Sequence, residues 1–336
     1  MSRFAFSCLV LLVWLPARAS TNLTPATALL LDDKTVIRLT AELKQYENPP
    51  QLAGKLTSIG SGTATVLINR WAHEFATFFP AVELDIHGGG SADAMPAFLE
   101  GKVDLMPMSR PLWADEAARC KARFGYEPAQ IVVAQDAIGV YVNKNNPIPG
   151  LTLAQLDAIY SREAKRGGAR PEFWSDLGVT GPLAEERIIR ICLSSVHGTH
   201  LFFRDYVMQG ADYRFGGRFE AVSGSLVQAV GADETGIGFA SVMFATARTR
   251  FVPLQAADGR YLLPSYENTL SGQYPLVRPM RIVFHRKPDG AMNPVAREFL
   301  RFAVSRRGQR IIALADSYPL TVEQQQDALG VIDGPP

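Results

Sequence analysis

Four turns rich in glycine and hydroxyl side chains precede segments that the apolar pattern predicts to be helices. They are the turns 60–63 (Gly-Ser-Gly-Thr), 88–91 (Gly-Gly-Gly-Ser), 197–199 (His-Gly-Thr) and 223–225 (Ser-Gly-Ser). The first N–H groups of a helix have no partner inside the helix, and the helix dipole adds partial positive charge at that end. Glycine lets a ligand approach the backbone closely, and the hydroxyls donate further hydrogen bonds. Turns of this composition are suited to bind an oxyanion.

A single such turn carries little weight, because serine and threonine are common helix N-caps. Here two occur in each half of the chain, which favours a shared anion site. A fifth segment, 106–111 (Met-Pro-Met-Ser-Arg-Pro), follows a predicted strand and offers the hydroxyl of Ser109 and the guanidinium of Arg110. A guanidinium makes permanently charged, bidentate contacts to oxyanions. The alternative is that Arg110 is an ordinary surface arginine.

Motifs for enzymatic chemistry are lacking. No serine lies in a Gly-x-Ser-x-Gly pattern, and the turn 60–63 lacks the lysine that a nucleotide P-loop requires. His197 and His200 are spaced like two metal ligands on a helix, but no third ligand is evident, so surface or core histidines are the alternative. The sequence therefore favours a binding protein without metal or cofactor over an enzyme.

Composition excludes several broad classes. The 336 residues are 47% hydrophobic and 20% charged, enough to bury one or two cores and too apolar for a disordered chain. Lys+Arg total 34 and Asp+Glu total 33, a formal net charge of +1, so no overall basic field exists to hold nucleic acid or an anionic membrane. Any anion must be held by a local site.

The N-terminal segment 1–19 has the pattern of a secretory signal peptide. Arg3 precedes an apolar run at 4–15, and Ala17-Arg18-Ala19 predicts cleavage after Ala19. A retained membrane anchor is the alternative, but the run is shorter than the ~20 residues that a spanning helix needs. Of the three cysteines, Cys120 and Cys192 would remain in an oxidising compartment, where pairing is possible. We expect these two cysteines in different parts of the fold, which disfavours their pairing.

Short apolar runs alternate with amphipathic stretches, which indicates α/β layering. Leu67, Trp71, Phe75 and Phe78 recur at helical spacing and predict a helix over 64–79. The expected strands cover 55–59, 82–87, 103–106 and 131–142, and further helices are expected over 92–99 and 152–161.

Two helix starts are predicted from capping patterns. Thr152 and Gln155 form a capping-box pattern ahead of an apolar stripe. Asn293-Pro294 places proline in a favoured first-turn position and predicts the start of a last long helix.

Five motifs occur in an order that resembles the phosphate-binding proteins of Pst-type ABC importers. They read SIGSGTATVLINRWAHEFATFFPAVELDIHGGGSADAMPAFLEGKVDLMPMSRPL, VVAQDAIGVYVNKNNPIPGLTLAQLDAIYS, LSSVHGTHLFFRDYV, SGSLVQAVGADETGIGFASV and PLVRPMRIVFHRKP, the last followed by EFLRFAVSRRGQRII. The resemblance covers about residues 52–320, which is nearly the whole expected mature fold.

The resemblance implies an α/β type II periplasmic binding protein, with two lobes that are each a mixed sheet flanked by helices and a hinge of two crossings. Closing of the lobes would replace the hydration of the anion by fixed donors. The expected divisions are a signal peptide at 1–19, a lead-in at 20–51, lobe one at 52–139 plus 249–325, lobe two at 140–248 and a C-terminal tail at 326–336.

The turns and the resemblance together imply a set of ligand-binding residues. They are Ser61, Gly62, Thr63, Ser91, Ser109, Arg110, His197, Gly198 and Thr199. Arg110 stands where many family members have aspartate, although a subset of the family carries the same Ser-Arg-Pro as 109–111.

Two positions depart from the family pattern. Leu193 stands where the family usually has an arginine, and His197 replaces the first serine of its Ser-Gly-Thr turn. Loss of that arginine removes a charge-assisted contact worth ~1.5–3 kcal/mol. Arg110 from the other lobe, or a protonated His197, is the candidate replacement.

We therefore expect a monomeric periplasmic protein that captures inorganic phosphate, or a similar tetrahedral oxyanion, for an ABC permease in the inner membrane. The alternative is a two-lobed sensor or interaction protein that has lost transport or binds another solute, because a fold alone does not fix a function. A hydrolase of phosphate esters would need a nucleophile–base pair or a metal set, and neither pattern is evident.

Overall fold

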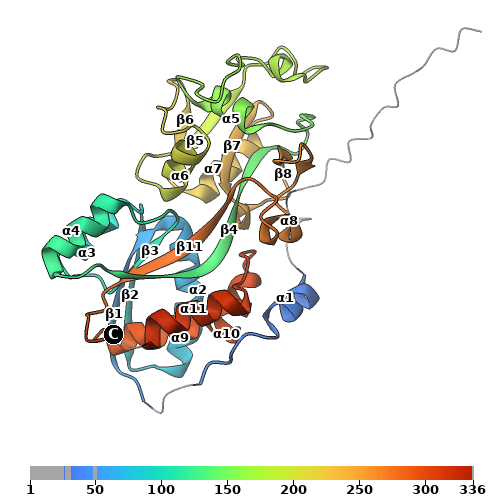
Figure 1. Ribbon diagram of the computed structural model, residues 1–336. Helices are drawn as coiled ribbons and strands as arrows, with labels where there is room; N and C mark the ends of the chain where they lie inside the picture. The colour runs from blue at the N-terminus through green and yellow to red at the C-terminus, as the bar shows by residue number, and fades with distance from the viewer. Residues whose placement is uncertain (1–25, 27–31, 48–50, 335–336) are drawn as a thin grey trace, which may run out of the picture.

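Nine of the described strands form one hydrogen-bonded sheet that runs through two lobes. The computed structural model describes residues 26, 32–47 and 51–334 (Figure 1). The strand order is β2-β1-β3-β11-β4-β7-β5-β6, with β8 paired to β4 and a separate ribbon of β9 and β10. Both parallel and antiparallel pairs occur, so the expected two-lobed α/β fold with mixed sheets is confirmed.

Lobe one holds the first strands of the path and most of the long helices. Its strands are β1 (Gly54–Ser61), β2 (Val82–Gly89), β3 (Leu105–Met108), β11 (Val277–Phe284) and the first part of β4 (Ala129–Asn143). Its helices are α1 (Asp33–Thr40), α2 (Gly62–Phe78), α3 (Ala94–Leu99), α4 (Ala114–Phe124), α9 (Pro294–Val304), α10 (Arg306–Ala313) and α11 (Val322–Asp333). β1 runs parallel to both β2 and β3, so these three strands end at the same edge.

The predicted helix after Thr63 is present as α2. Leu67, Trp71 and Phe75 are fully buried, and Phe78 packs partly buried against the same core. The indole Nε1 of Trp71 donates to the carbonyl of Gly308 at 2.8 Å, which ties α2 to α10. Its apolar stripe thus anchors α2 on the sheet, with its N-terminus at the edge where β1 ends.

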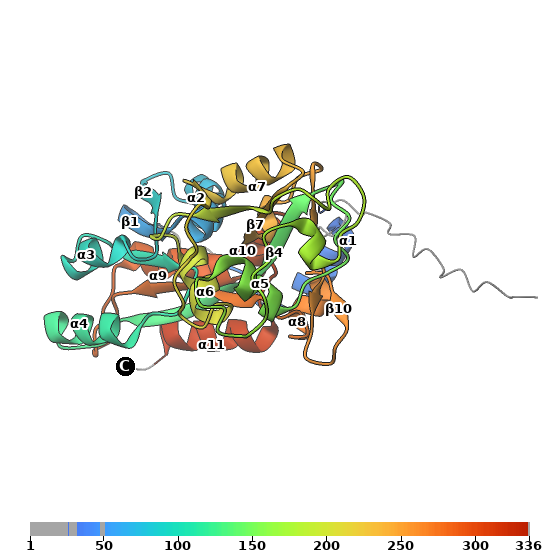
Figure 2. The same ribbon diagram turned by 90° about the horizontal axis from the view of Figure 1, so that it is seen from above.

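Lobe two contains the remaining strands, with helices on both faces. Its strands are β5 (Ile189–Leu193), β6 (Arg218–Glu220), β7 (Gly236–Ser241), β8 (Thr249–Phe251), β9 (Leu254–Gln255), β10 (Tyr261–Leu262) and the last part of β4. Its helices are α5 (Leu153–Tyr160), α6 (Gly198–Tyr206), α7 (Ser223–Ala232) and α8 (Tyr266–Leu270), with 3-10 turns at Trp174–Leu177 and Val242–Phe244. Seen from above, α7 lies on one side of β7, and α5 and α6 lie on the other (Figure 2).

Both capping predictions are confirmed. Thr152 and Gln155 exchange reciprocal bonds of 2.9 and 3.0 Å at the start of α5. The Asn293 side chain accepts from the Val295 N–H at 2.9 Å, with proline as the first residue of α9.

The chain crosses between the lobes on β4 and again at the start of β11. Ala134 packs in the lobe-one core and Ala137 in the lobe-two core, so β4 changes lobes between them. Residues 249–276 were expected in lobe one, but they lie in lobe two. β8 pairs with the lobe-two part of β4, with Phe251 opposite Tyr141, and the following segment stays in the same core. The second crossing therefore lies at β11.

Both ends of the described chain are more structured than expected. The lead-in contains α1, and Arg306 donates from its N–H to the carbonyl of Lys44 at 2.8 Å. The expected tail is the end of α11, whose Ala328 and Ile332 are buried in the lobe-one core. The predicted signal peptide 1–19 lies outside the described residues.

The two cysteines of the expected mature chain are free thiols. Cys120 is buried in lobe one and Cys192 in lobe two, in separate apolar clusters. Burial raises the pKa of Cys192 to about 12, so this thiol stays protonated and inert. Within the described residues, the helices are too short or too polar to cross a bilayer.

Candidate functional site

The turn at Ser61 places the start of α2 at the edge of the lobe-one sheet. β1 ends at Ser61 and α2 begins at Gly62, and the Ser61 hydroxyl caps the helix by accepting from the Ala64 N–H at 3.4 Å. The same hydroxyl donates to Ser109 Oγ at 2.7 Å. Thr63, one residue into the helix, is buried beside them. Helix dipole and hydroxyls therefore face one point.

Two further serines reach this point from the ends of the neighbouring strands. Ser91 follows β2 and Ser109 follows β3, and their hydroxyl oxygens lie 3.5 Å apart. The Ser109 N–H also points to Ser91 Oγ, at 3.4 Å. Because β1 runs parallel to both strands, their carboxyl ends meet at one edge, which brings the serines together. All of these side chains are nearly inaccessible to solvent.

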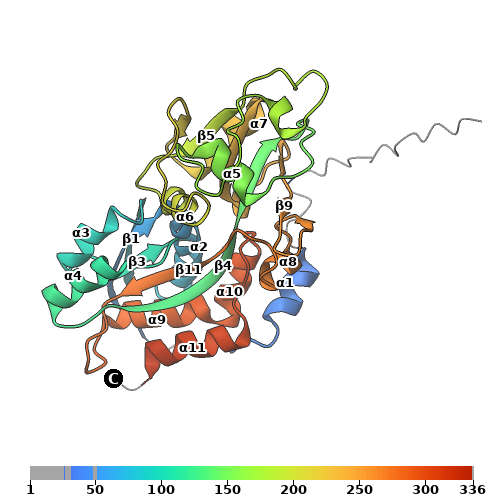
Figure 3. The ribbon, with the colours of Figure 1, turned by 45° about the horizontal axis from the view of Figure 1, so that its top comes forward.

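Lobe two contributes the start of α6 to the same point. Figure 3 shows α6 over the ends of β1 and β3 and the start of α2. Thr199 Oγ1 lies 3.5 Å from Thr63 Oγ1 across the boundary between the lobes. Gly198 packs so closely that a Cβ there would lie 2.3 Å from Ser109 Oγ. Two helix N-termini, one from each lobe, therefore converge on one set of buried hydroxyls.

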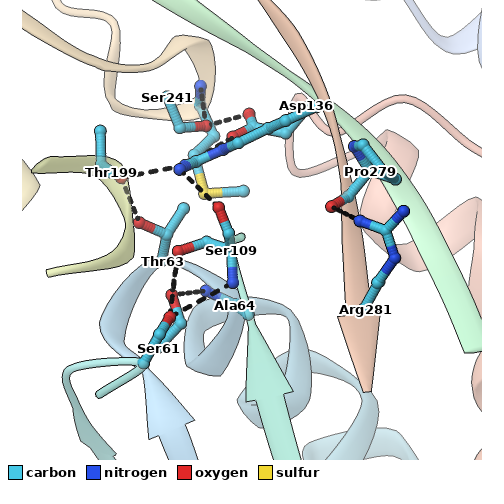
Figure 4. Close-up of polar contacts among 12 residues, drawn as sticks. Ser61, Thr63, Ala64, Ser109, Asp136, Thr199, Ser241, Pro279 and Arg281 are labelled. Carbon is cyan, nitrogen blue, oxygen red and sulfur yellow. Dashed lines mark hydrogen bonds and ion pairs between the residues drawn. The ribbon is translucent and has the colours of Figure 1, made fainter. Parts of the chain in front are cut away.

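We call this set the hydroxyl cluster; its members are Ser61, Thr63, Ser91, Ser109 and Thr199. Figure 4 shows the side chains of Ser61, Thr63, Ser109 and Thr199 converging. Hydroxyls and helix N–H groups from several directions form a donor shell suited to a small anion with several oxygens.

Arg278 is a further candidate site residue, which the motifs in the sequence did not indicate. Its side chain is buried, and its Nη1 donates to the Ser109 carbonyl at 2.9 Å while Nη2 donates to Thr199 Oγ1 at 3.0 Å. The carboxylate of Asp136 pairs with it, 3.0 Å from Nε and 2.9 Å from Nη2. A cation therefore lies against the hydroxyl cluster, from the hinge strand β11.

The Asp136 carboxylate is fully occupied. Its second oxygen accepts from the Ser241 hydroxyl, and the Ala137 N–H also donates to the carboxylate. Burial raises the pKa of Asp136, and the three donors, Arg278 foremost, oppose that shift by stabilising the charged form. A weak signal for this pair exists in the sequence. Arg278 shares the buried face of its strand with Met280 and Ile282, where a lone charge is unusual.

Arg110 is placed differently from the expectation. Its Nη1 and Nη2 donate to the two oxygens of Glu116 at 2.8 and 2.6 Å, and its guanidinium stacks on Trp113 with 3.7 Å to the ring centre. Glu116 also accepts from the Trp113 N–H at 2.9 Å. Only the Nε of Arg110 lacks a partner. The guanidinium of Arg110 is thus bound to Glu116 at the start of α4. The guanidinium that lies beside the hydroxyl cluster is that of Arg278.

The two histidines are engaged by backbone carbonyls. His197 Nε2 lies 2.6 Å from the Ala221 carbonyl, and His200 Nδ1 lies 2.8 Å from the Leu193 carbonyl. Burial lowers the pKa of His200 to about 4, so its imidazole is neutral at physiological pH. Among the described residues, no group of three or more His, Cys, Asp or Glu side chains is placed to hold a metal ion, so the two histidines have no third ligand.

The fourth turn, 223–225, starts α7 but is not hydrogen-bonded to the hydroxyl cluster in the described structure. The Ser225 hydroxyl donates to the Val222 carbonyl at its own helix start, at an exposed position. Of the nine expected site residues, seven form or adjoin the hydroxyl cluster, His197 lies beside Gly62 but bonds to the Ala221 carbonyl, and Arg110 pairs with Glu116. The structure adds Arg278.

A two-lobed α/β fold with buried donors converging from both lobes defines a solute-binding protein of the periplasmic binding type. A family model described as the PBP superfamily domain matches residues 46–307. The phosphate-binding protein PstS of Pseudomonas aeruginosa is 32% identical over 289 residues, which cover 85% of this chain and 90% of that protein. The chain therefore belongs to the PBP superfamily and, within it, to the family of these PstS proteins.

Solved structures agree on the fold. A putative phosphate ABC transporter substrate-binding protein with bound phosphate from Clostridium perfringens superposes with a TM-score of 0.67 at 24% identity, covering 80% of this chain and 100% of that one. An ABC-type phosphate transport receptor from Vibrio cholerae gives a TM-score of 0.63 at 20% identity, with the same coverage.

Proposed function

We propose that this protein is an extracytoplasmic solute-binding protein that captures inorganic phosphate between its lobes for an ABC importer. The observation that carries the proposal is the convergence of α2 and α6, one helix from each lobe, on the hydroxyl cluster. The names of its PstS relatives and of the phosphate-bound structural neighbour support phosphate as the anion. Arsenate and other tetrahedral oxyanions share the geometry.

The proposed donors come from both lobes. Lobe one offers the hydroxyls of Ser61, Thr63, Ser91 and Ser109 and the N–H groups at the start of α2, including that of Gly62. Lobe two offers the Thr199 hydroxyl and the N–H groups at the start of α6, including that of Gly198, whereas the His197 N–H already donates to the Ser194 carbonyl at 3.1 Å. Each bond from these groups to a charged oxygen is worth ~1.5–3 kcal/mol, so a few of them suffice for micromolar binding.

The arrangement supports binding rather than hydrolysis. In the described structure, the cluster hydroxyls bond to one another and to Arg278, and no histidine or carboxylate accepts a proton from them. A hydroxyl without a neighbouring base is a weak nucleophile. We therefore propose a non-enzymatic role without a cofactor.

The predicted signal peptide 1–19 would direct the chain to the periplasm, where a monomer would deliver phosphate to a permease in the inner membrane.

The direct test is calorimetric titration of residues 20–336, after unfolding, dialysis and refolding to remove copurified anion. We expect phosphate to bind with a Kd in the micromolar range or tighter. Sulfate, a tetrahedral anion that carries no proton at neutral pH, is the control for selectivity. Absence of heat with phosphate, from protein shown by circular dichroism to have refolded, would refute the proposal and favour a sensor of another solute.

A further inference from the structure

The guanidinium of Arg278 bonds to both lobes from a strand that joins them. It is the second residue of β11, just after the second crossing. Nη1 donates to the Ser109 carbonyl of lobe one, and Nη2 donates to the Thr199 hydroxyl of lobe two. We propose that Arg278 is a positioning residue that holds the two lobes closed over the anion and orients the Thr199 hydroxyl, with Asp136 fixing the guanidinium in the hinge. This inference rests on the proposed function.

Asp136 and Arg278 stand directly opposite each other on the two crossing strands, β4 and β11. The carboxylate binds the Nε edge of the guanidinium, and Ser241 from β7 holds the other carboxylate oxygen. Both side chains of the pair are about 1% exposed. The guanidinium therefore has one available orientation, with its Nη groups directed at the boundary between the lobes.

The bond to Thr199 determines what this hydroxyl can do. A threonine oxygen that accepts from a guanidinium keeps its own proton for another acceptor. The nearest cluster oxygen, Thr63 Oγ1, lies 3.5 Å away, on the side where the anion is proposed to bind. Arg278 thus makes Thr199 a donor toward the anion. Arg278 acts by orienting the Thr199 hydroxyl and not by adding charge, because Asp136 neutralises the guanidinium and leaves the pair without net charge.

The position of Arg278 in the hinge also bears on the order of anion binding and lobe closure. Arg278 lies in the hinge, so it is in place before closure and gains its Thr199 bond as α6 arrives. Loss of Arg278 should therefore speed release of the anion more than it slows capture.

A double-mutant cycle on phosphate binding tests this proposal. The variants are Arg278→Gln, Thr199→Val and the two combined, with Kd measured by calorimetry and rates by stopped-flow fluorescence. We expect each single change to raise Kd at least about tenfold. The Kd of the combined variant should exceed that of the more weakly binding single variant by less than about threefold, because both changes remove one linked interaction. The rise should come from faster dissociation, with association changed by less than about threefold.

Arg250 provides the matched control. It is a buried arginine of lobe two whose guanidinium donates to the carbonyls of Asn146 and Phe251, away from the hydroxyl cluster. We expect Arg250→Gln to leave the phosphate Kd within about threefold of the wild type, and to combine with Thr199→Val additively in free energy.

Arg278→Gln leaves Asp136 buried without its cation, which can prevent folding. The combined Arg278→Gln and Asp136→Asn variant removes both charges and keeps the test available, and Thr199→Val leaves the ion pair intact. If the Arg278 variants bind phosphate with the affinity of the wild type, this inference is overturned and the proposed function stands. The same holds if the free-energy effects of Arg278→Gln and Thr199→Val on binding are strictly additive. Failure of the wild type to bind phosphate would overturn both.

Discussion

Gly198 of lobe two lies directly against Ser109 of lobe one, so closely that a Cβ on Gly198 would be 2.3 Å from the Ser109 hydroxyl oxygen and 2.5 Å from that of Ser91. Real Cβ atoms do not approach oxygens to this distance. A methyl group at this position would therefore have to displace the two serine hydroxyls or hold the start of α6 away from them, so the close approach of the two lobes depends on glycine at position 198.

The first prediction concerns this contact. Gly198→Ala should raise the phosphate Kd by about 100-fold or more, because the added methyl group holds α6 away from the hydroxyl cluster. Alanine favours helix over glycine, so the midpoint of thermal unfolding without ligand should not fall. Gly224→Ala is the matched control, since Gly224 is the second residue of α7 and faces open space. Equal Kd values for the two variants would contradict this account.

Ser109 is the centre of the hydroxyl cluster, because it accepts from Ser61 at 2.7 Å and lies 3.5 Å from Ser91. Ser109→Ala should raise the phosphate Kd by about ten- to 100-fold, as expected for one lost hydrogen bond to a charged oxygen. Calorimetry beside Ser225→Ala, which removes an exposed serine hydroxyl from the start of α7, separates loss of a site hydroxyl from loss of a serine hydroxyl elsewhere. An unchanged Kd in Ser109→Ala would remove this hydroxyl from the site.

Arg110 should matter for stability rather than for binding. Arg110→Gln leaves the Glu116 carboxylate buried without its bidentate partner, and the free energy of unfolding in urea should fall by ~3–5 kcal/mol. The phosphate Kd of the folded fraction should stay within about threefold of the wild type. A tenfold weaker Kd with little loss of stability would instead return Arg110 to the anion site.

His200 should make the folded protein sensitive to mild acid. Burial lowers its pKa to about 4 in the folded protein, against about 6.5 when unfolded, so the unfolded chain binds the proton first as the pH falls. The free energy of unfolding should therefore decrease below about pH 6.5, by ~1–2 kcal/mol at pH 5. His285, whose pKa burial also lowers, acts in the same direction.

The measurement is urea unfolding between pH 7.5 and 5 in a buffer without phosphate, because a ligand would add its own linkage. His200→Gln should show a shallower loss of stability than the wild type over this range. The same slope in both proteins would show that His200 is not the group responsible.

Much of the site could be predicted because its signals are local. Glycine and hydroxyl residues at the start of a helix act through N–H groups within one turn, so the pattern at 60–63 carries its own meaning. The positions of Ser91 and Ser109 follow from strands that end at one edge of a parallel sheet. The expected strands 55–59, 82–87 and 103–106 and the expected helix 64–79 are together sufficient to place these donors.

Arg278 and Asp136 are 142 residues apart, and only the pairing of β4 with β11 brings them together. No local pattern records that pairing. For Arg110 the sequence leaves open an anion contact or an ordinary surface position, and the partner in the structure is instead the carboxylate of Glu116, six residues later. Glu116 is well placed to pair with Arg110 because the Trp113 N–H donates to the same carboxylate and fixes its position at the start of α4.

The position of the second crossing between the lobes could not be predicted from the sequence. Residues 249–276 contain short strands and turns without a strong period, and their assignment to lobe two depends on the pairing of β8 with β4. A three-residue strand is too short for its sequence pattern to indicate which strand it pairs with.

The crystal structure of residues 20–336 grown with phosphate would test the central claim most directly. We predict a tetrahedral anion between the lobes, with oxygens about 3 Å from Ser109 Oγ, Thr63 Oγ1 and Thr199 Oγ1 and from the first N–H groups of α2 and α6. Phosphate bound elsewhere, or a cleft that closes on the hydroxyl cluster without any anion at saturating phosphate, would contradict the account.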